Sequence, residues 1–268
     1  MYFRSRKSMP LWVLMGLAPV LLSACGTQKS AAGSVKTSPA VKQSGDKTVP
    51  AKARAGTPVP PLSLLTLAGR IQAAQPVHMN TTITDTLGNA HVQMTSAVDP
   101  INKEAESTEH ATLSGISGAN AVTVVGQSIR IGQHSWGQST PPGGGWHEET
   151  VHLTNPFPIG ELLPYIVNVH PVSGQLVRGH ETQGVSATLD KQGVRLLESL
   201  SAGKSVSPAQ QIITSMVFTL WIGPEHHPRK LHLTEHCVQD GRPYEVLETT
   251  IYFHWGQGLH LTGPTVAN

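Results

Sequence analysis

The segment Tyr244-Glu-Val-Leu-Glu-Thr-Thr-Ile-Tyr-Phe-His-Trp255 decides the fold class, because it follows the two-residue period of a β-strand. Every second residue from Leu247 to Trp255 lies on one face, on which apolar side chains predominate, and we expect this face to point inward. Two further strands precede it, Met216–Ile222 and Arg229–Val238. Long strands that follow one another without intervening helices predict an antiparallel sheet.

Upstream, the same period predicts strands over residues 77–83, 92–98, 104–113, 121–125, 128–131 and 185–189, with a hairpin-like break at Gly126-Gln127. A short final strand is expected at Leu259–Thr262. Helical spacing predicts a first helix from Pro61, with Leu64, Leu67, Ala68 and Ile71 on one face.

Two more helices are expected in the middle of the chain. Ile159, Leu162, Leu163, Ile166 and Val167 recur at helical spacing around Pro164, which predicts a kinked helix or two short ones. Asp190 is a plausible N-cap for a helix that ends near Gly203. The order of elements predicts an α+β fold, a curved antiparallel β-sheet (half-barrel) with helices packed on the concave face, as a single domain over residues 61–268.

The N-terminus has the features of an export signal. Three basic residues precede the apolar run Pro10–Ala24, which is too short for a transmembrane helix. Leu22-Ser-Ala-Cys25 resembles the lipobox of bacterial lipoproteins, in which the leader is cut before an acylated cysteine. We therefore predict a lipoprotein signal peptide over residues 1–24 and lipidation at Cys25; an ordinary secreted protein is the alternative.

The composition of the rest of the chain predicts a tether before the folded domain, and it argues against nucleic-acid binding. Residues 25–60 are rich in Ser, Thr, Pro and Lys and predict a disordered tether. The formal charge of +2 comes from the leader, since without its three bases 16 basic residues face 17 acidic ones. We therefore expect no nucleic-acid partner. Neither a Gly-x-Ser-x-Gly elbow nor an H-E-x-x-H helix occurs, so we expect no enzyme, no catalytic residue and no cofactor.

The 14 histidines raise the question of a metal site. His232 and His236 would lie about 13 Å apart on a strand that rises ~3.3 Å per residue, too far for one ion. We expect solvated histidines and no metal, with a surface zinc or copper site or a pH-sensitive surface as alternatives. Cys237 shares a strand face with Leu231 and Leu233, so a buried, inert thiol is expected.

Several motifs resemble those of the LppX/LprG-type lipoproteins of actinobacteria, within the broader LolA/LolB-like half-barrel group. Beside the lipobox and tether, they are Ser128-Ile-Arg-Ile-Gly-Gln-His-Ser-Trp136 before Gly145-Trp146, Gly179-His-Glu-Thr-Gln-Gly-Val-Ser-Ala-Thr-Leu-Asp190, Leu220-Trp-Ile-Gly-Pro224 before Pro228-Arg-Lys-Leu231, and Tyr252-Phe-His-Trp-Gly256 before Gly263-Pro264. The chain departs from the family at Gly223, where an Asp is usual.

The resemblance implies a non-catalytic carrier on the extracytoplasmic face of the cell membrane, anchored through acylated Cys25. Such a protein holds lipid or lipoglycan acyl chains in a cavity between sheet and helices. The expected lining comprises Leu162, Leu163, Ile166, Val167, Leu196, Leu197, Trp221, Phe253 and Trp255. An envelope sensor or scaffold with the same fold, which binds an unknown envelope protein, is the alternative.

Overall fold

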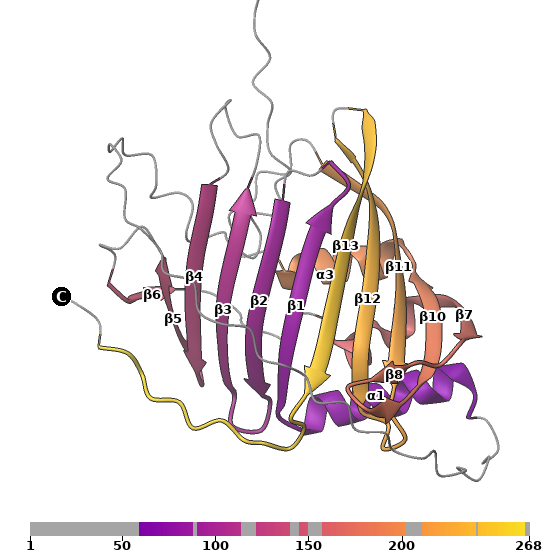
Figure 1. Ribbon diagram of the computed structural model, residues 1–268, viewed down its shortest axis with the longest axis horizontal. Helices are drawn as coiled ribbons and strands as arrows, with labels where there is room; N and C mark the ends of the chain where they lie inside the picture. The colour runs from indigo at the N-terminus through magenta and orange to yellow at the C-terminus, as the bar shows by residue number, and fades with distance from the viewer. Residues whose placement is uncertain are drawn as a thin grey trace, which may run out of the picture.

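One antiparallel sheet of eleven strands dominates the computed structural model, which describes residues 59–87, 90–113, 122–139, 145–149, 157–201, 211–239 and 241–265 (Figure 1). The strand order is β6-β5-β4-β3-β2-β1-β13-β12-β11-β10-β7. The bounds are β1 Val77–Asp85, β2 Ala90–Asp99, β3 Glu104–Leu113, β4 Val122–Ile131, β5 His134–Ser139, β6 His147–Glu149, β7 Ile166–Val172, β10 Gln183–Leu189, β11 Gln211–Ile222, β12 Pro228–Gln239 and β13 Arg242–Phe253. A small hairpin, β8 Leu176–Val177 with β9 His180–Glu181, forms a separate sheet.

The helices pack against one face of this curved sheet, as Figure 1 shows for α3 behind the strands and α1 across their lower ends. They are α1 Pro61–Ala74, α2 Ile159–Leu162, the 3-10 helix η2 Leu163–Tyr165 and α3 Lys191–Ser201. The predicted α+β half-barrel with helices on its concave face is thus confirmed. The predicted signal peptide, and the tether up to residue 58, lie outside the described residues.

The main core lies between the helices and strands β1, β13, β12, β11 and β10. Its members include Leu65 and Leu162 from the helices and Met79, Phe218 and Tyr252 from the sheet, all fully buried. Each large apolar side chain buried in this way contributes ~1.5–3 kcal/mol. We call the sheet face that carries Met79, Phe218 and Tyr252 the inner face and the opposite one the outer face.

The inner face of β13 differs from the prediction. Tyr244, Val246 and Tyr252 are buried, so the even-numbered residues point inward. The alternating run from Leu247 to Phe253 therefore lies on the outer face. The hairpin β8–β9 covers part of the outer face of β13, so both faces of this strand carry apolar side chains. The two-residue period alone therefore does not show which face points inward.

The expected kinked helix over 159–167 is only half correct. The chain is helical from Ile159 to Tyr165, and Ile166 then begins strand β7. Proline disfavours continuation of a helix, and strand pairing of Ile166 with Leu189 and of Val167 with Thr188 takes over. The apolar residues at helical spacing thus belong to two short helical turns and to the strand that follows them.

Three smaller predictions have different outcomes. Asp190 caps α3 as predicted, since its Oδ1 accepts hydrogen bonds from the amides of Gln192 and Gly193 at 2.9 and 2.8 Å. The break predicted at Gly126-Gln127 is wrong, because β4 runs unbroken from Val122 to Ile131. The final strand predicted at Leu259–Thr262 is also wrong: amides of Leu259 and Leu261 donate to the side chains of Asp99 and Glu104 instead of to a neighbouring strand.

Candidate functional site

A cavity of about 420 Å³ lies between helices α1 and α2 and one end of strands β1 to β4. This volume falls within the ~300–1,000 Å³ typical of ligand pockets. Its lining comprises Gly69, Gln72, Ala73, Val77, Val98, Asp99, Pro100, Lys103, Glu104, Ala105, Arg130, Pro158, Gly160 and Glu161. The structure therefore contains a space of the size and position that a small apolar ligand requires.

Sheet register builds one wall of the cavity. Val77 pairs with Val98, Val98 with Ala105, and Ala105 with Arg130. Directly paired residues share a face, so these four side chains form a row across β1, β2, β3 and β4 on the inner face. The row is apolar over three strands and ends in a guanidinium.

The helical wall depends on close contact between α1 and α2. A Cβ at Gly69 would lie 3.0 Å from the backbone nitrogen of Gly160, so the two helices meet backbone to backbone. The buried side chain of Gln72 spans the same junction: its Nε2 donates to the carbonyl of Phe157 and its Oε1 accepts from the amide of Ile159, both at 3.0 Å. Both Gly69 and Gln72 line the cavity, so this junction fixes the shape of the cavity.

Charged groups of both signs line the cavity. Lys103, Glu104 and Arg130 lie close together near the β2–β3 turn, and Glu161 adds a second carboxylate from α2. Arg130 donates from Nε to the carbonyl of Gly132 at 3.1 Å, which holds its guanidinium beside the β3–β4 strand ends. The arrangement suits a ligand with an apolar part and a polar end.

Asp99 organises the β2–β3 turn. Burial raises the pKa of its carboxyl, but amide donors, led by Asn102 and Leu259, outweigh burial and hold the pKa below the ordinary value. Its Oδ1 accepts from the amides of Ile101 and Asn102, both at 3.0 Å, and its Oδ2 from the amide of Leu259 at 3.3 Å. An ionised Asp99 thus ties the C-terminal segment to the β2–β3 turn.

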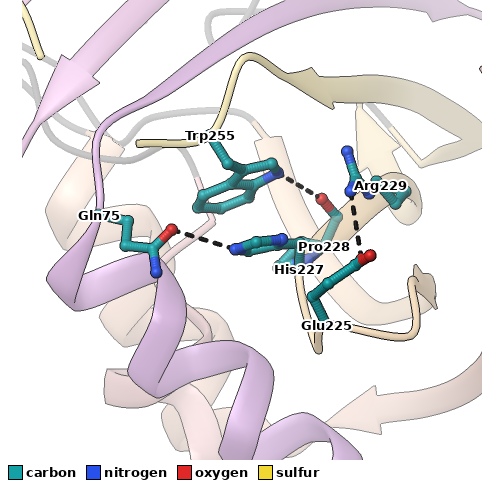
Figure 2. Close-up of polar contacts among 6 residues, drawn as sticks. All are labelled: Gln75, Glu225, His227, Pro228, Arg229 and Trp255. Carbon is teal, nitrogen blue, oxygen red and sulfur yellow. Dashed lines mark hydrogen bonds and ion pairs between the residues drawn. The ribbon is translucent and has the colours of Figure 1, made fainter. Parts of the chain in front are cut away.

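The C-terminal end of α1 is held by a second polar cluster (Figure 2). His227 Nε2 bonds Gln75 Oε1 at 3.0 Å, and the imidazole stacks on Trp255 with ring centroids 5.1 Å apart. Trp255 in turn donates from Nε1 to the carbonyl of Pro228 at 3.1 Å. Burial, then the charge of Arg229, lowers the pKa of His227, so the neutral imidazole is favoured.

Acidic side chains occupy the inner face away from the cavity. Burial raises the pKa of Glu109 to about 7. Burial, together with the negative neighbours Glu248 and Glu198, raises the pKa of Glu235 to about 8. Glu248 accepts a hydrogen bond from Thr250 at 2.9 Å, and burial still raises its pKa. Burial is the largest cause of the raised pKa in all three carboxyl groups.

The nine residues predicted to line a cavity do not lie around this one. Leu162 and Leu197 are buried in the main core, while Leu163, Ile166, Leu196 and Trp255 are partly buried against it. Val167 is 40% exposed. That any of these seven contacts a ligand stays a prediction, since none lines the cavity that the structure shows.

Trp221 and Phe253 require a correction. Their neighbours Leu220, Ile222 and Tyr252 belong to the main core, so strand alternation places both rings on the outer face. Each ring is covered there by a cation: Lys230 lies 4.9 Å from the Trp221 ring centroid and Arg178 lies 4.5 Å from that of Phe253. The space between sheet and helices is therefore not lined by either residue.

Several residues that line the cavity could not be predicted from the sequence, for a physical reason. Gly69, Gly160 and Ala105 shape the cavity through the side-chain volume they lack, which leaves no positive pattern in a sequence. Gln72 did carry a signal, because it follows Ala68 by four residues on the buried face of α1. A polar residue at such a position indicates a buried hydrogen-bonding role.

Among the described residues there is neither a candidate metal cluster nor a candidate membrane-spanning helix. Within the described ranges, no three His, Cys, Asp or Glu side chains gather in a way that could hold a metal ion. Cys237 is buried beside Tyr244 and Val246, and its predicted burial is confirmed. None of the described helices has the length and apolar character needed to cross a bilayer.

The structure resembles solved lipoproteins at low sequence identity. LprF from Mycobacterium bovis aligns with 78% of this chain and 99% of its own, at 14% identity and a TM-score of 0.48. The Mycobacterium tuberculosis lipoprotein LppX aligns with 75% of this chain and 97% of its own, at 12% identity and a TM-score of 0.48. No protein-family model and no curated protein matches the sequence.

Proposed function

We propose that this chain is a membrane-anchored extracytoplasmic lipoprotein that binds or carries a lipid or another apolar ligand between its sheet and helices. The cavity of about 420 Å³ carries this proposal, because its sheet wall is apolar across three strands. The ligand's acyl chain would lie along Val77, Val98 and Ala105. Each methylene transferred from water into such a site gains ~0.8 kcal/mol, so a chain of eight gains ~6 kcal/mol.

The charged side chains of the cavity lining support an amphipathic ligand. Lys103 and Arg130 favour an anionic group, and Glu104 and Glu161 accept hydrogen bonds from hydroxyls or an amine. A lipid or lipoglycan offers these groups next to its acyl chains.

The N-terminal segment supports delivery at a membrane surface. In the proposal, Cys25 carries the acyl anchor and residues 25–60 form the tether. A flexible chain of that length spans ~30 Å on average, from 5–6 Å per square root of residue number. The cavity would then stay near the bilayer from which lipids are taken.

Ligand identity can be tested on purified protein. The protein is extracted with organic solvent and the extract is analysed by mass spectrometry, followed by titration of the delipidated protein with a fluorescent fatty acid. The proposal predicts a stoichiometric lipid in the extract and saturable binding of the probe. Protein that yields no lipid and binds no probe would contradict the carrier function and favour the sensor or scaffold.

A further inference from the structure

A second, open pocket of about 410 Å³ lies on the outer face of the sheet, on the other side from the cavity. Ile251 on β13, Asn80 on β1 and Lys230 on β12 form its floor. The segment Gln175–Arg178, which contains strand β8, forms its side, and Figure 1 shows β8 in front of the strands. Val177 is 5% exposed, so the hairpin packs firmly against the sheet and does not project from it.

Two cations line this pocket without a counter-charge. Arg178 and Lys230 each lie over an aromatic ring, Phe253 and Trp221 respectively. In the part of the chain that the structure describes, neither cation forms an ion pair. A ring face attracts a cation but does not accept its N–H groups as a carboxylate does, so both cations keep free hydrogen-bond donors.

An amide donor in the same pocket also has no acceptor. The side-chain nitrogen of Gln175 is buried and makes no hydrogen bond within the described residues. A buried donor without a partner destabilises the folded protein, and a bound acceptor removes that cost. Asn80 adds a second amide to the lining, and Glu181 on the same hairpin does not line the pocket.

We infer that this outer-face pocket is a second binding site, for a phosphate group, whether on a soluble phosphorylated molecule or in a lipid headgroup. Arg178 would bind two phosphate oxygens through its planar guanidinium, and Lys230 would supply a point charge. The buried amide of Gln175 then has its acceptor. Exposed Leu176 and half-buried Ile251 offer apolar contact to the molecule that carries the phosphate.

This site is tested on the full-length protein by calorimetric titration with inorganic phosphate at low ionic strength. We expect saturable binding that weakens at least tenfold in Arg178→Gln and in Lys230→Gln, since a hydrogen bond to a charged group contributes ~1.5–3 kcal/mol. Arg242→Gln, at the other end of β13 and outside the pocket, is the matched control and should change the affinity by less than about twofold.

A second arm separates the two sources of phosphate. Co-sedimentation compares vesicles of anionic phosphatidylglycerol with vesicles of zwitterionic phosphatidylcholine, and the comparison is repeated with Ala105→Leu, which weakens binding in the inner cavity. Binding of either probe that depends on Arg178 and Lys230 supports the site and identifies the source. Absence of binding to both probes, or binding that the two variants leave unchanged while their unfolding curves match wild type, overturns it.

Discussion

Ala105→Leu tests directly whether the inner cavity is an empty space. Ala105 is 2% exposed, lies on β3 between Val98 and Arg130, and lines the cavity. Leucine adds three carbon groups, which at ~30 Å³ each, the share of a water molecule in the liquid, take up ~90 Å³. That is about a fifth of the 420 Å³ present.

The expected effects on stability and on binding are opposite in sign. The three added carbon groups, one methine and two methyls, enter existing space and add up to ~2.4 kcal/mol to the free energy of unfolding. A bound acyl chain loses room for about three methylenes, and the same ~2.4 kcal/mol weakens its binding roughly 50-fold. Urea unfolding followed by circular dichroism gives the first quantity, and titration with a fluorescent fatty acid gives the second.

Ala111→Leu is the matched control. Ala111 lies on the same strand and the same face, is 0% exposed, and does not line the cavity. Overpacking there should lower the free energy of unfolding by ~1–3 kcal/mol. If Ala105→Leu is destabilised as much as Ala111→Leu, the space beside Ala105 is already filled and the reasoning about the cavity is refuted.

Four other predictions concern three buried or half-buried side chains and the predicted lipid anchor. Burial raises the pKa of Glu109 to about 7, so its ionisation lowers the free energy of unfolding by ~3 kcal/mol as pH rises from about 4.5 to 7. Glu235 and Glu248 add falls of the same sign, so Glu109→Gln should reduce the total fall by ~3 kcal/mol, and denaturant titrations at several pH values that show the full wild-type fall in this variant would contradict the burial argument. Burial, then the charge of Arg229, lowers the pKa of His227, so protonation of its imidazole lowers the free energy of unfolding as pH falls below 6.5. His227→Phe should make the free energy of unfolding less dependent on pH in that range, and an unchanged dependence would mean that the imidazole stays accessible to protons. Gln72→Ala leaves the buried carbonyl of Phe157 and amide of Ile159 without partners and should cost ~2–4 kcal/mol in urea unfolding, whereas Gln192→Ala on the exposed side of α3 should cost little. Cys25→Ser should move the protein from the membrane to the soluble fraction on cell fractionation; unchanged membrane association would contradict lipidation at this residue.

Residue patterns predicted the architecture because the strands of a half-barrel repeat a simple period. The three C-terminal strands and the helix from Pro61 are where the pattern placed them. The inner face of β13 was not predictable, because Phe253 and Ile251 look as buried as Tyr252 and Val246. Only the hairpin β8–β9 and its Arg178, which cover the outer face, explain why both faces are apolar.

The sequence predicted that a cavity lies between the sheet and the helices, but it did not predict which residues line it. Large apolar side chains such as Leu162 and Leu197 were expected to line it, and they fill the core instead. The cavity lies where the chain has small residues, at Gly69, Ala105 and Gly160, and where register aligns them. Register between strands and contact between helices depend on tertiary structure, so neither is readable from local spacing.

The most direct test of lipid binding in the inner cavity is a crystal structure of the protein with a fatty acid brominated along its chain. Anomalous scattering from bromine then locates the chain independently of the model of the protein. The proposal predicts bromine peaks beside Val77, Val98 and Ala105, and weaker peaks there in crystals of Ala105→Leu soaked at the same concentration. Bromine found only outside this cavity, or none at a concentration that saturates binding in solution, would contradict it.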